Sequence, residues 1–204
     1  MKKIIIIFII CFISFFNLEG AKTFAYDEEL SSEVSEYCTK GEKVLTYYES
    51  LDDKTDGLKY LNAAKYFFYQ AIRLDKSSAN ALIGMAKISL YQNKTRDAKN
   101  ALMMALNFNP ENPRVAHFLG DTFFQEGDYT EAIDYYDWAY RHGYKYNYNT
   151  NFQLAVCYEK IYEQKKAIKH YNEALKIKPE SQAVKDRLKK MDEANKEVFV
   201  QKTE

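Results

Sequence analysis

The side chains best suited to chemistry in this chain are its three histidines, His117, His142 and His170. They fall in separate segments, and none of them belongs to an H-E-x-x-H zinc motif. His117 and Asp121 are one helical turn apart and could offer two ligands to a metal ion, but a zinc site needs at least three protein ligands. We therefore expect no metal site, no cofactor and no catalytic residue.

The other polar motifs also argue against an enzyme. The chain has no nucleophile elbow and no glycine-rich phosphate loop. Four carboxylates lie around one predicted helix, a pattern that is typical of a solvated helix face rather than of acid–base chemistry. These carboxylates belong to Asp128, Glu131, Asp134 and Asp137.

The composition is that of a folded protein without a dominant charge. Hydrophobic residues make up 47% and aromatic residues 16% of the 204 residues, enough for a substantial core. Lys and Arg total 29, as do Asp and Glu, so no net field attracts nucleic acid or an anionic membrane. We expect neither as a partner.

The first residues differ from the rest of the chain. Lys2 and Lys3 precede an apolar run at 4–16, which is shorter than the roughly 20 residues of a spanning helix. We interpret residues 1–25 as a signal peptide, so the protein is expected to be exported to a periplasm or to the extracellular space. It would touch the membrane only through this segment, if the segment stayed uncleaved.

Two cysteines follow this segment, Cys38 and Cys157. They are too few for a disulfide-stapled scaffold, although one bridge could form in an oxidising compartment. Two buried free thiols are the favoured interpretation, because Cys157 occupies the position that Ile88 and Thr122 hold in sister segments.

Small residues recur every 34 or 35 positions, which indicates a repeat protein. Apolar residues within each unit recur at spacings of three and four, so each unit divides into two amphipathic helices. Turns are expected at 92–94, 126–128 and 161–163, and all three prolines lie at unit boundaries. The recurring small residues are Ala86, Gly120 and Ala155; Ala98, Ala132 and Ala167; and Ala105, Ala139 and Ala174.

Residues 79–181 resemble the tetratricopeptide repeat (TPR) family. The middle unit carries the likeness most fully, through Leu119, Gly120, Phe123, Gly127, Tyr129, Ala132, Tyr136 and Ala139. The resemblance implies an all-α fold, an α-solenoid of stacked antiparallel helix hairpins with three clear units. The expected segments are N-terminal helices with a degenerate repeat at 26–78, units at 79–112, 113–147 and 148–181, and a capping helix and tail at 182–204.

The degenerate repeat lacks a recognisable first helix. Leu58–Leu74 matches the second helix of a unit. Its partner is expected earlier, around Glu28–Tyr48, with a long turn at 52–56 between the two helices. The run Ser181–Val198 is amphipathic and is expected to cover the last apolar face of the stack.

The resemblance also implies a concave groove lined by the first helices of successive units. Such a surface suits a peptide with apolar anchors, although these side chains could instead pack against each other or the capping helix. The candidate binding residues are Ile83, Lys87, Leu90, Tyr91, His117, Asp121, Phe124, Phe152 and Val156. Six further residues are expected on this surface: Asn80, Arg114, Gln125, Asn149, Glu159 and Lys160.

Three functions are compatible with this sequence. The first is an exported scaffold or adaptor that binds a protein or peptide partner. The second is a homo-oligomeric, self-associating component of an envelope complex, and the third is a subunit of an enzyme whose chemistry belongs to a partner. Some TPR proteins grip a C-terminal carboxylate with Lys, Asn and Arg on three neighbouring helices; here Lys87, Asp121 and Val156 hold those places, which disfavours that ligand.

Overall fold

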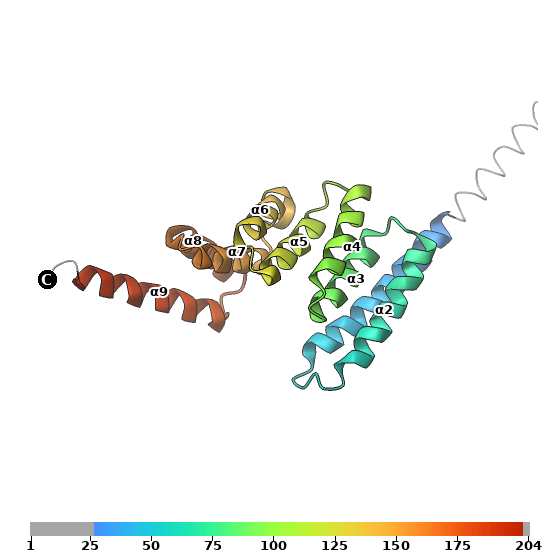
Figure 1. Cartoon of the computed structure of the whole chain (residues 1–204), viewed down its shortest axis with the longest axis horizontal. Coiled ribbons are helices and arrows are strands. Elements are labelled where there is room, and N and C mark those ends of the chain that lie inside the picture. Colours follow the sequence, from blue (N-terminus) through green and yellow to red (C-terminus); the bar gives the residue numbers. More distant parts are fainter. Residues whose placement is uncertain (1–26, 202–204) are drawn as a thin grey trace, which may run out of the picture. The chain divides into compact units, whose positions relative to one another are not determined.

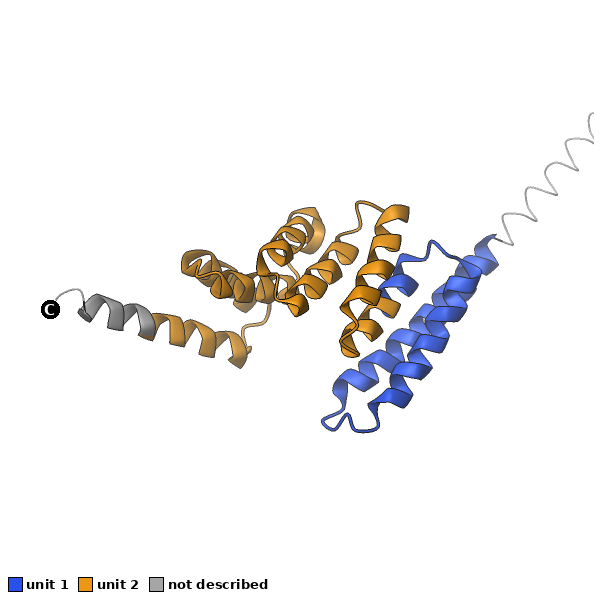
Figure 2. Cartoon of the chain, viewed as in Figure 1, with its two compact units in different colours: residues 1–84 blue, residues 85–204 orange. Residues whose placement is uncertain are grey.

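The computed structural model describes residues 27–201, and side chains are described as far as residue 193. The described part is helical and contains no strand, in agreement with the predicted all-α fold (Figure 1). It divides into two compact units, residues 1–84 and 85–204 (Figure 2). The predicted signal peptide, residues 1–25, lies outside the described residues.

Unit 1 is built from a helix at residues 27–50, helix α2 (Gly57–Leu74) and the first part of helix α3 (Ala79–Tyr91). The first two helices lie where the degenerate repeat was predicted, and the intervening residues 51–56 form the expected long turn. Phe68 on α2 is fully buried. A methyl group added at Gly41 would come within 2.7 Å of the Phe68 ring, and one added at Gly84 within 2.3 Å. Both glycines are therefore needed for this packing.

Unit 2 contains the rest of α3 and a series of helices that form two complete hairpins. Helices α5 and α6 pack on each other, as do α7 and α8, and neighbouring hairpins are joined by contacts between α4 and α5 and between α6 and α7. Helix α9 packs on α8 as the predicted capping helix. The bounds are α4 (Thr95–Phe108), α5 (Pro113–Glu126), α6 (Tyr129–Ala139), α7 (Tyr148–Lys160), α8 (Gln164–Ile177) and α9 (Gln182–Gln201).

Local sequence signals set the ends of the central helices. The side chain of Asn112 accepts hydrogen bonds from the first backbone amides of α5, and Pro113 occupies the first helical position, where no amide is needed. Gly127 ends the same helix with a φ of 81°, a left-handed conformation that favours glycine. Asn147 caps α7 by accepting from the amide of Thr150 at 2.9 Å.

The repeated alanines form the interior of the stack. Six of these alanines are fully buried. They are Ala98, Ala132 and Ala167 of one recurring set and Ala105, Ala139 and Ala174 of another. Tyr136 is also fully buried and lies against Gly120, where an added methyl group would come within 2.6 Å of the ring. The absence of a side chain at Gly120 therefore makes room for the aromatic ring of the neighbouring helix.

The link between the second and third repeats departs from a simple turn. After α6 the chain forms a π-helical segment, η1 (Tyr140–Tyr144), in which Gly143 adopts a φ of 127°. The backbone of His142 and Gly143 is non-helical, so the chain bends within this segment. The stretch coincides with the point where the repeat spacing changes from 34 to 35 residues.

Both described cysteines, Cys38 and Cys157, are buried free thiols, as favoured from the sequence. Burial raises the pKa of Cys157 to about 12, so its thiol is protonated and unreactive at neutral pH. Among residues 27–201, no helix is long and apolar enough to cross a membrane.

Candidate groove of the first helices

A cavity of about 260 Å³ opens between the first helices of three successive repeats in unit 2. We call it the groove cavity. Its walls mix apolar and polar side chains from α3, α5 and α7. They are Lys87, Leu90, Tyr91, Phe118, Asp121, Phe124, Gln125 and Gln153.

Five of the nine residues predicted to bind a partner line this cavity. Lys87, Leu90 and Tyr91 come from α3, and Asp121 and Phe124 come from α5. Tyr91 is 38% exposed, whereas Leu90 is buried and contributes only part of the cavity floor. The cavity therefore brings together predicted residues from two of the expected helices, and their role in binding stays a prediction.

The other four predicted residues do not line the groove cavity. Ile83, His117 and Val156 are buried, and burial leaves them little surface to offer a partner. Phe152 stacks on Tyr148 with ring centroids 5.9 Å apart and packs edge-on against Tyr171, within the apolar cluster beneath α9. These four side chains pack within the stack, which favours the alternative interpretation for them.

Two further residues line the cavity but were not predicted from the sequence, Phe118 and Gln153. They are equivalent positions of successive repeats, 35 residues apart, and each directly follows a residue that had been chosen, His117 or Phe152. A shift of one residue turns a helical side chain by about 100°. The repeat pattern therefore indicated the correct turn of each helix. The residue assigned to the groove was one position too early in the sequence.

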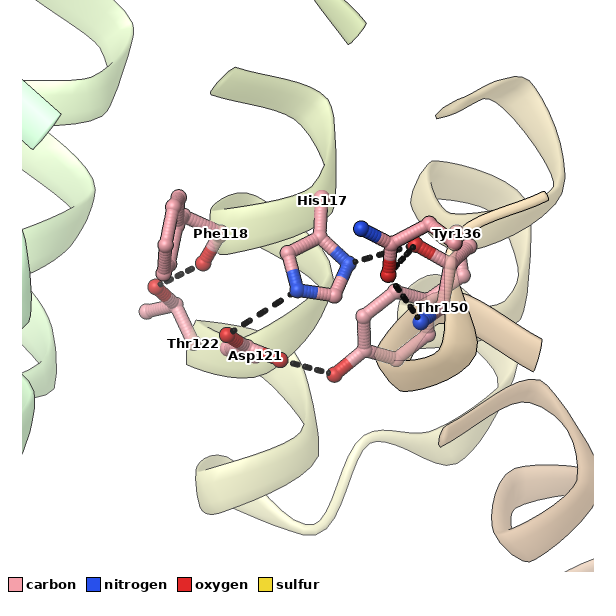
Figure 3. Close-up of polar contacts among 7 residues, drawn as sticks. His117, Phe118, Asp121, Thr122, Tyr136 and Thr150 are labelled. Carbon is pink, nitrogen blue, oxygen red and sulfur yellow. Dashed lines mark hydrogen bonds and ion pairs between the residues drawn. The ribbon is translucent and has the colours of Figure 1, made fainter. Parts of the chain in front are cut away.

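A polar network holds Asp121, which lines the groove cavity, and the neighbouring His117 in place (Figure 3). The hydroxyl of Tyr136 donates to Asp121 Oδ1 at 2.6 Å, and His117 Nε2 lies 3.7 Å from Asp121 Oδ2. On its other side, His117 Nδ1 lies 3.0 Å from the hydroxyl of Thr150. Because these residues belong to α5, α6 and α7, the network joins three consecutive helices.

Burial governs the charges in this network. Desolvation lowers the pKa of His117, the nearby charge of Asp121 opposing the shift, so the imidazole is neutral at pH 7. Desolvation raises the pKa of Asp121, whereas His117, the Tyr136 hydrogen bond and the charge of Lys87 all act to lower it. Both ring nitrogens of His117 already face protein groups.

His117 and Asp121 are therefore positioned as structural partners rather than as the beginning of a metal site. Within the described part of the chain, no group of three or more His, Cys, Asp or Glu side chains is placed to hold a metal ion. The groove cavity itself pairs a cationic group, Lys87, with apolar rings and two amides. This lining can accept an apolar side chain and orient the polar atoms beside it.

A second buried tyrosine makes the matching contact in the next repeat. The hydroxyl of Tyr171 donates to Glu159 Oε2 at 2.6 Å, and Arg187 on α9 donates to Glu159 Oε1 at 2.8 Å. Glu159 was expected on the binding surface, but these bonds tie it to the capping helix. The polar network here holds α7, α8 and α9 together.

The model of one known family, the tetratricopeptide repeat protein 21 C-terminal ARM domain, matches residues 43–191, well over half of the chain. The chain belongs to this family. No curated protein matches it. The match confirms the TPR-type repeat that the sequence predicted, and places this protein within a family of helical repeat domains.

Solved structures of TPR proteins share the fold. PilF of Pseudomonas aeruginosa has a TM-score of 0.66 at 18% identity, over 84% of this chain and 77% of that one. The first TPR of Spaghetti (RPAP3), bound to the HSP90 peptide SRMEEVD, has a TM-score of 0.54 at 16% identity, over 57% and 94% of the two chains. MamA has a TM-score of 0.52 at 20% identity, over 62% and 74%. These likenesses establish the fold.

Proposed function

We propose that this protein is a non-catalytic interaction scaffold that holds a segment of a protein partner in the groove cavity. The observation that carries the proposal is the convergence of five predicted binding residues on one cavity, formed by the first helices of successive repeats. The first helices of successive repeats line the concave surface of a helical repeat array, and such proteins commonly bind partners there.

The lining favours an apolar anchor over an acidic peptide end. Leu90, Phe118 and Phe124 supply apolar surface, and Lys87 and Gln125 supply polar groups at its margin. The HSP90 peptide bound by the first TPR of Spaghetti ends in acidic residues. A ligand of that kind would meet Asp121 here, and the three-helix Lys, Asn and Arg arrangement is absent from the equivalent positions. We therefore propose a partner segment that inserts an aliphatic or aromatic side chain.

Affinity capture with a groove variant tests this proposal. Tyr91→Ala with Gln125→Ala alters two exposed residues of the cavity wall. A matched control, Tyr146→Ala with Gln164→Ala, alters exposed residues elsewhere in unit 2. We expect the unaltered chain and the control to recover the same partner, and the groove variant to lose it while its circular dichroism stays unchanged.

Retention of that partner by the groove variant would contradict the proposal. Recovery of only further copies of this chain would favour the self-associating envelope component instead. Phe152→Ala is unsuitable as a groove variant, because Phe152 packs against Tyr148 and Tyr171, and its truncation removes core contacts.

We further propose that the scaffold acts outside the cytoplasm. The support is the pair of lysines followed by the apolar run at 4–16, which has the length of a signal-peptide core. Mass spectrometry of the protein from its own host tests the idea. The expected species lacks roughly the first 25 residues, and an intact N-terminus in the soluble cytoplasmic fraction would refute it.

A further inference from the structure

A second cavity, of about 360 Å³, lies between α4, α5 and α6 in unit 2. We call it the α4–α6 cavity. Leu106, Pro110 and Ala116 form an apolar part of its wall, and four residues of α6 form the rest. These four are Glu131, Asp134, Tyr135 and Trp138. The cavity shares no residue with the groove cavity, so it is a separate candidate site.

The carboxylates of this cavity lack cationic partners. Glu131 and Asp134 are both exposed and stand one helical turn apart, so their negative charges repel each other. Across residues 27–193, neither carboxylate forms an ion pair. Two like charges beside an apolar wall favour a ligand that carries positive charge on an apolar stem.

Each aromatic residue of the cavity stacks on a ring that does not line the cavity. Tyr135 stacks on Phe123 with ring centroids 5.2 Å apart and an interplanar angle of 9°. Trp138 stacks on His142 at 4.0 Å and 15°, and His142 Nδ1 lies 2.7 Å from the backbone oxygen of Trp138. Rings fixed in this way offer a cation a preformed surface, which reduces the entropy lost on binding.

The chain already builds a comparable cation site beside this cavity. Lys99 Nζ lies 4.3 Å from the centre of the Phe123 ring and 2.8 Å from Glu126 Oε2. An aromatic face and a carboxylate together hold this ammonium group. Tyr135, which stacks on the same Phe123, combines with Glu131 and Asp134 to present the same two elements to a ligand in the α4–α6 cavity.

We propose that the α4–α6 cavity binds an arginine side chain of a partner polypeptide. A planar guanidinium group stacks on aromatic rings and can bond two carboxylates at once, whereas a lysine ammonium is a strongly hydrated point charge. The three-carbon stem of arginine can lie along Leu106 and Pro110. The scaffold then contacts partners through two separate surfaces.

The single tryptophan of the chain provides a direct measurement, because Trp138 lines this cavity. Its one indole N–H signal can be followed by NMR while the full chain is titrated with Nα-acetyl-arginine amide. Nα-acetyl-citrulline amide is the matched neutral probe, since citrulline retains the shape of arginine without its charge. We expect a saturable shift with the arginine probe and an affinity roughly tenfold lower for citrulline.

Substitution of the carboxylates provides the second arm. Glu131→Gln with Asp134→Asn should weaken arginine binding about tenfold, whereas Glu180→Gln with Glu193→Gln, an equal charge change at exposed sites outside the cavity, should leave it unchanged. Equal binding of arginine and citrulline, or no saturable shift, would overturn the proposal. Lysine amide binding as tightly as arginine would overturn the assignment to a guanidinium. None of these results depends on the groove cavity.

Discussion

The buried tyrosines Tyr136 and Tyr171 show how single residues contribute to the stability of the repeat stack. Each is fully buried and each donates its hydroxyl to a carboxylate at 2.6 Å. The two acceptors differ in what else supports them. Glu159 also receives a bond from Arg187 at 2.8 Å, whereas His117 lies farther from Asp121, at 3.7 Å. The same chemical change at the two tyrosines should therefore have unequal costs.

We predict that Tyr136→Phe lowers the free energy of unfolding by roughly 1–3 kcal/mol, because Asp121 loses its best donor in a desolvated site. Tyr171→Phe should cost about 1 kcal/mol or less, since Glu159 keeps Arg187. Urea denaturation followed by circular dichroism measures both. A cost for Tyr171→Phe equal to or above that for Tyr136→Phe would show that the supporting bonds do not decide the difference.

His170 should make stability depend on pH. Burial lowers its pKa from 6.5 to about 4, helped by the charge of Lys169 and opposed by Glu173. Between these values the unfolded chain binds the proton and the folded chain does not, so stability rises with pH across this window and falls as pH drops from 6.5 towards 4. The full effect is on the order of 3 kcal/mol.

Comparison with His170→Asn isolates this contribution, because the asparagine amide can still donate to Asn151 Oδ1, which His170 Nδ1 meets at 3.2 Å. The difference in unfolding free energy between the two proteins should shrink as the pH falls from 6.5 to 4. A difference that stays constant would show that His170 titrates in the folded protein as it does in the unfolded chain. NMR titration of the imidazole provides an independent value of the pKa.

At the scale of the helices, the repeat step determined most of the fold. Small residues 34 or 35 positions apart are buried at helix contacts, so the step predicted which helices pair and where the turns lie. Side-chain direction was harder to obtain. Ile83 and His117 were assigned to the groove, although their side chains are buried and Phe118 lines the cavity instead. The repeat step alone does not settle a rotation of 100° about the helix axis.

The α4–α6 cavity was beyond sequence reasoning for a different reason. Glu131 and Asp134 were interpreted as part of a solvated helix face, and both are indeed exposed. Their setting depends on Leu106 and Pro110 from the preceding repeat, about 25 residues away in the chain. A cavity between repeats is a property of how hairpins stack, which periodicity alone does not specify.

The contact between α5 and α6 can be tested at Gly120. We predict that Gly120→Ala costs roughly 1–3 kcal/mol, because the added methyl group would come within 2.6 Å of the Tyr136 ring. Gly127→Ala, at the end of the same helix, meets no neighbouring atom and should cost about 1 kcal/mol through its φ of 81°. Urea denaturation of each variant gives the two values.

Combining each glycine substitution with Tyr136→Phe separates the two mechanisms. Gly120→Ala and Tyr136→Phe disturb one contact, so their costs should not add. Gly127→Ala lies about two helical turns away from Gly120 and should add to Tyr136→Phe. Additive costs for the Gly120 pair would mean that the methyl group is accommodated without moving Tyr136.

At the scale of the whole molecule, stability in a repeat array comes from contacts between neighbouring elements. Helix α9 has a special place in unit 2, because it covers the last apolar face of the stack. Val184 is fully buried there in a cluster with Tyr171 and Ala174 of α8, and Arg187 bonds Glu159 of α7. Loss of packing at α9 should therefore weaken the nearest helices first.

Val184→Ala tests whether loss of packing at α9 weakens the nearest helices most. The lost methyl groups should cost roughly 1–3 kcal/mol, and hydrogen exchange should show most of the lost protection in α8 and α9, with less in α7 and least in α4. Lys185→Ala, an exposed change on the same helix, is the matched control and should leave exchange nearly unaltered. An equal loss of protection from α4 to α9 would instead mean that unit 2 unfolds as one cooperative block. In that case α9 would support the groove cavity and the α4–α6 cavity as strongly as the helices that line them.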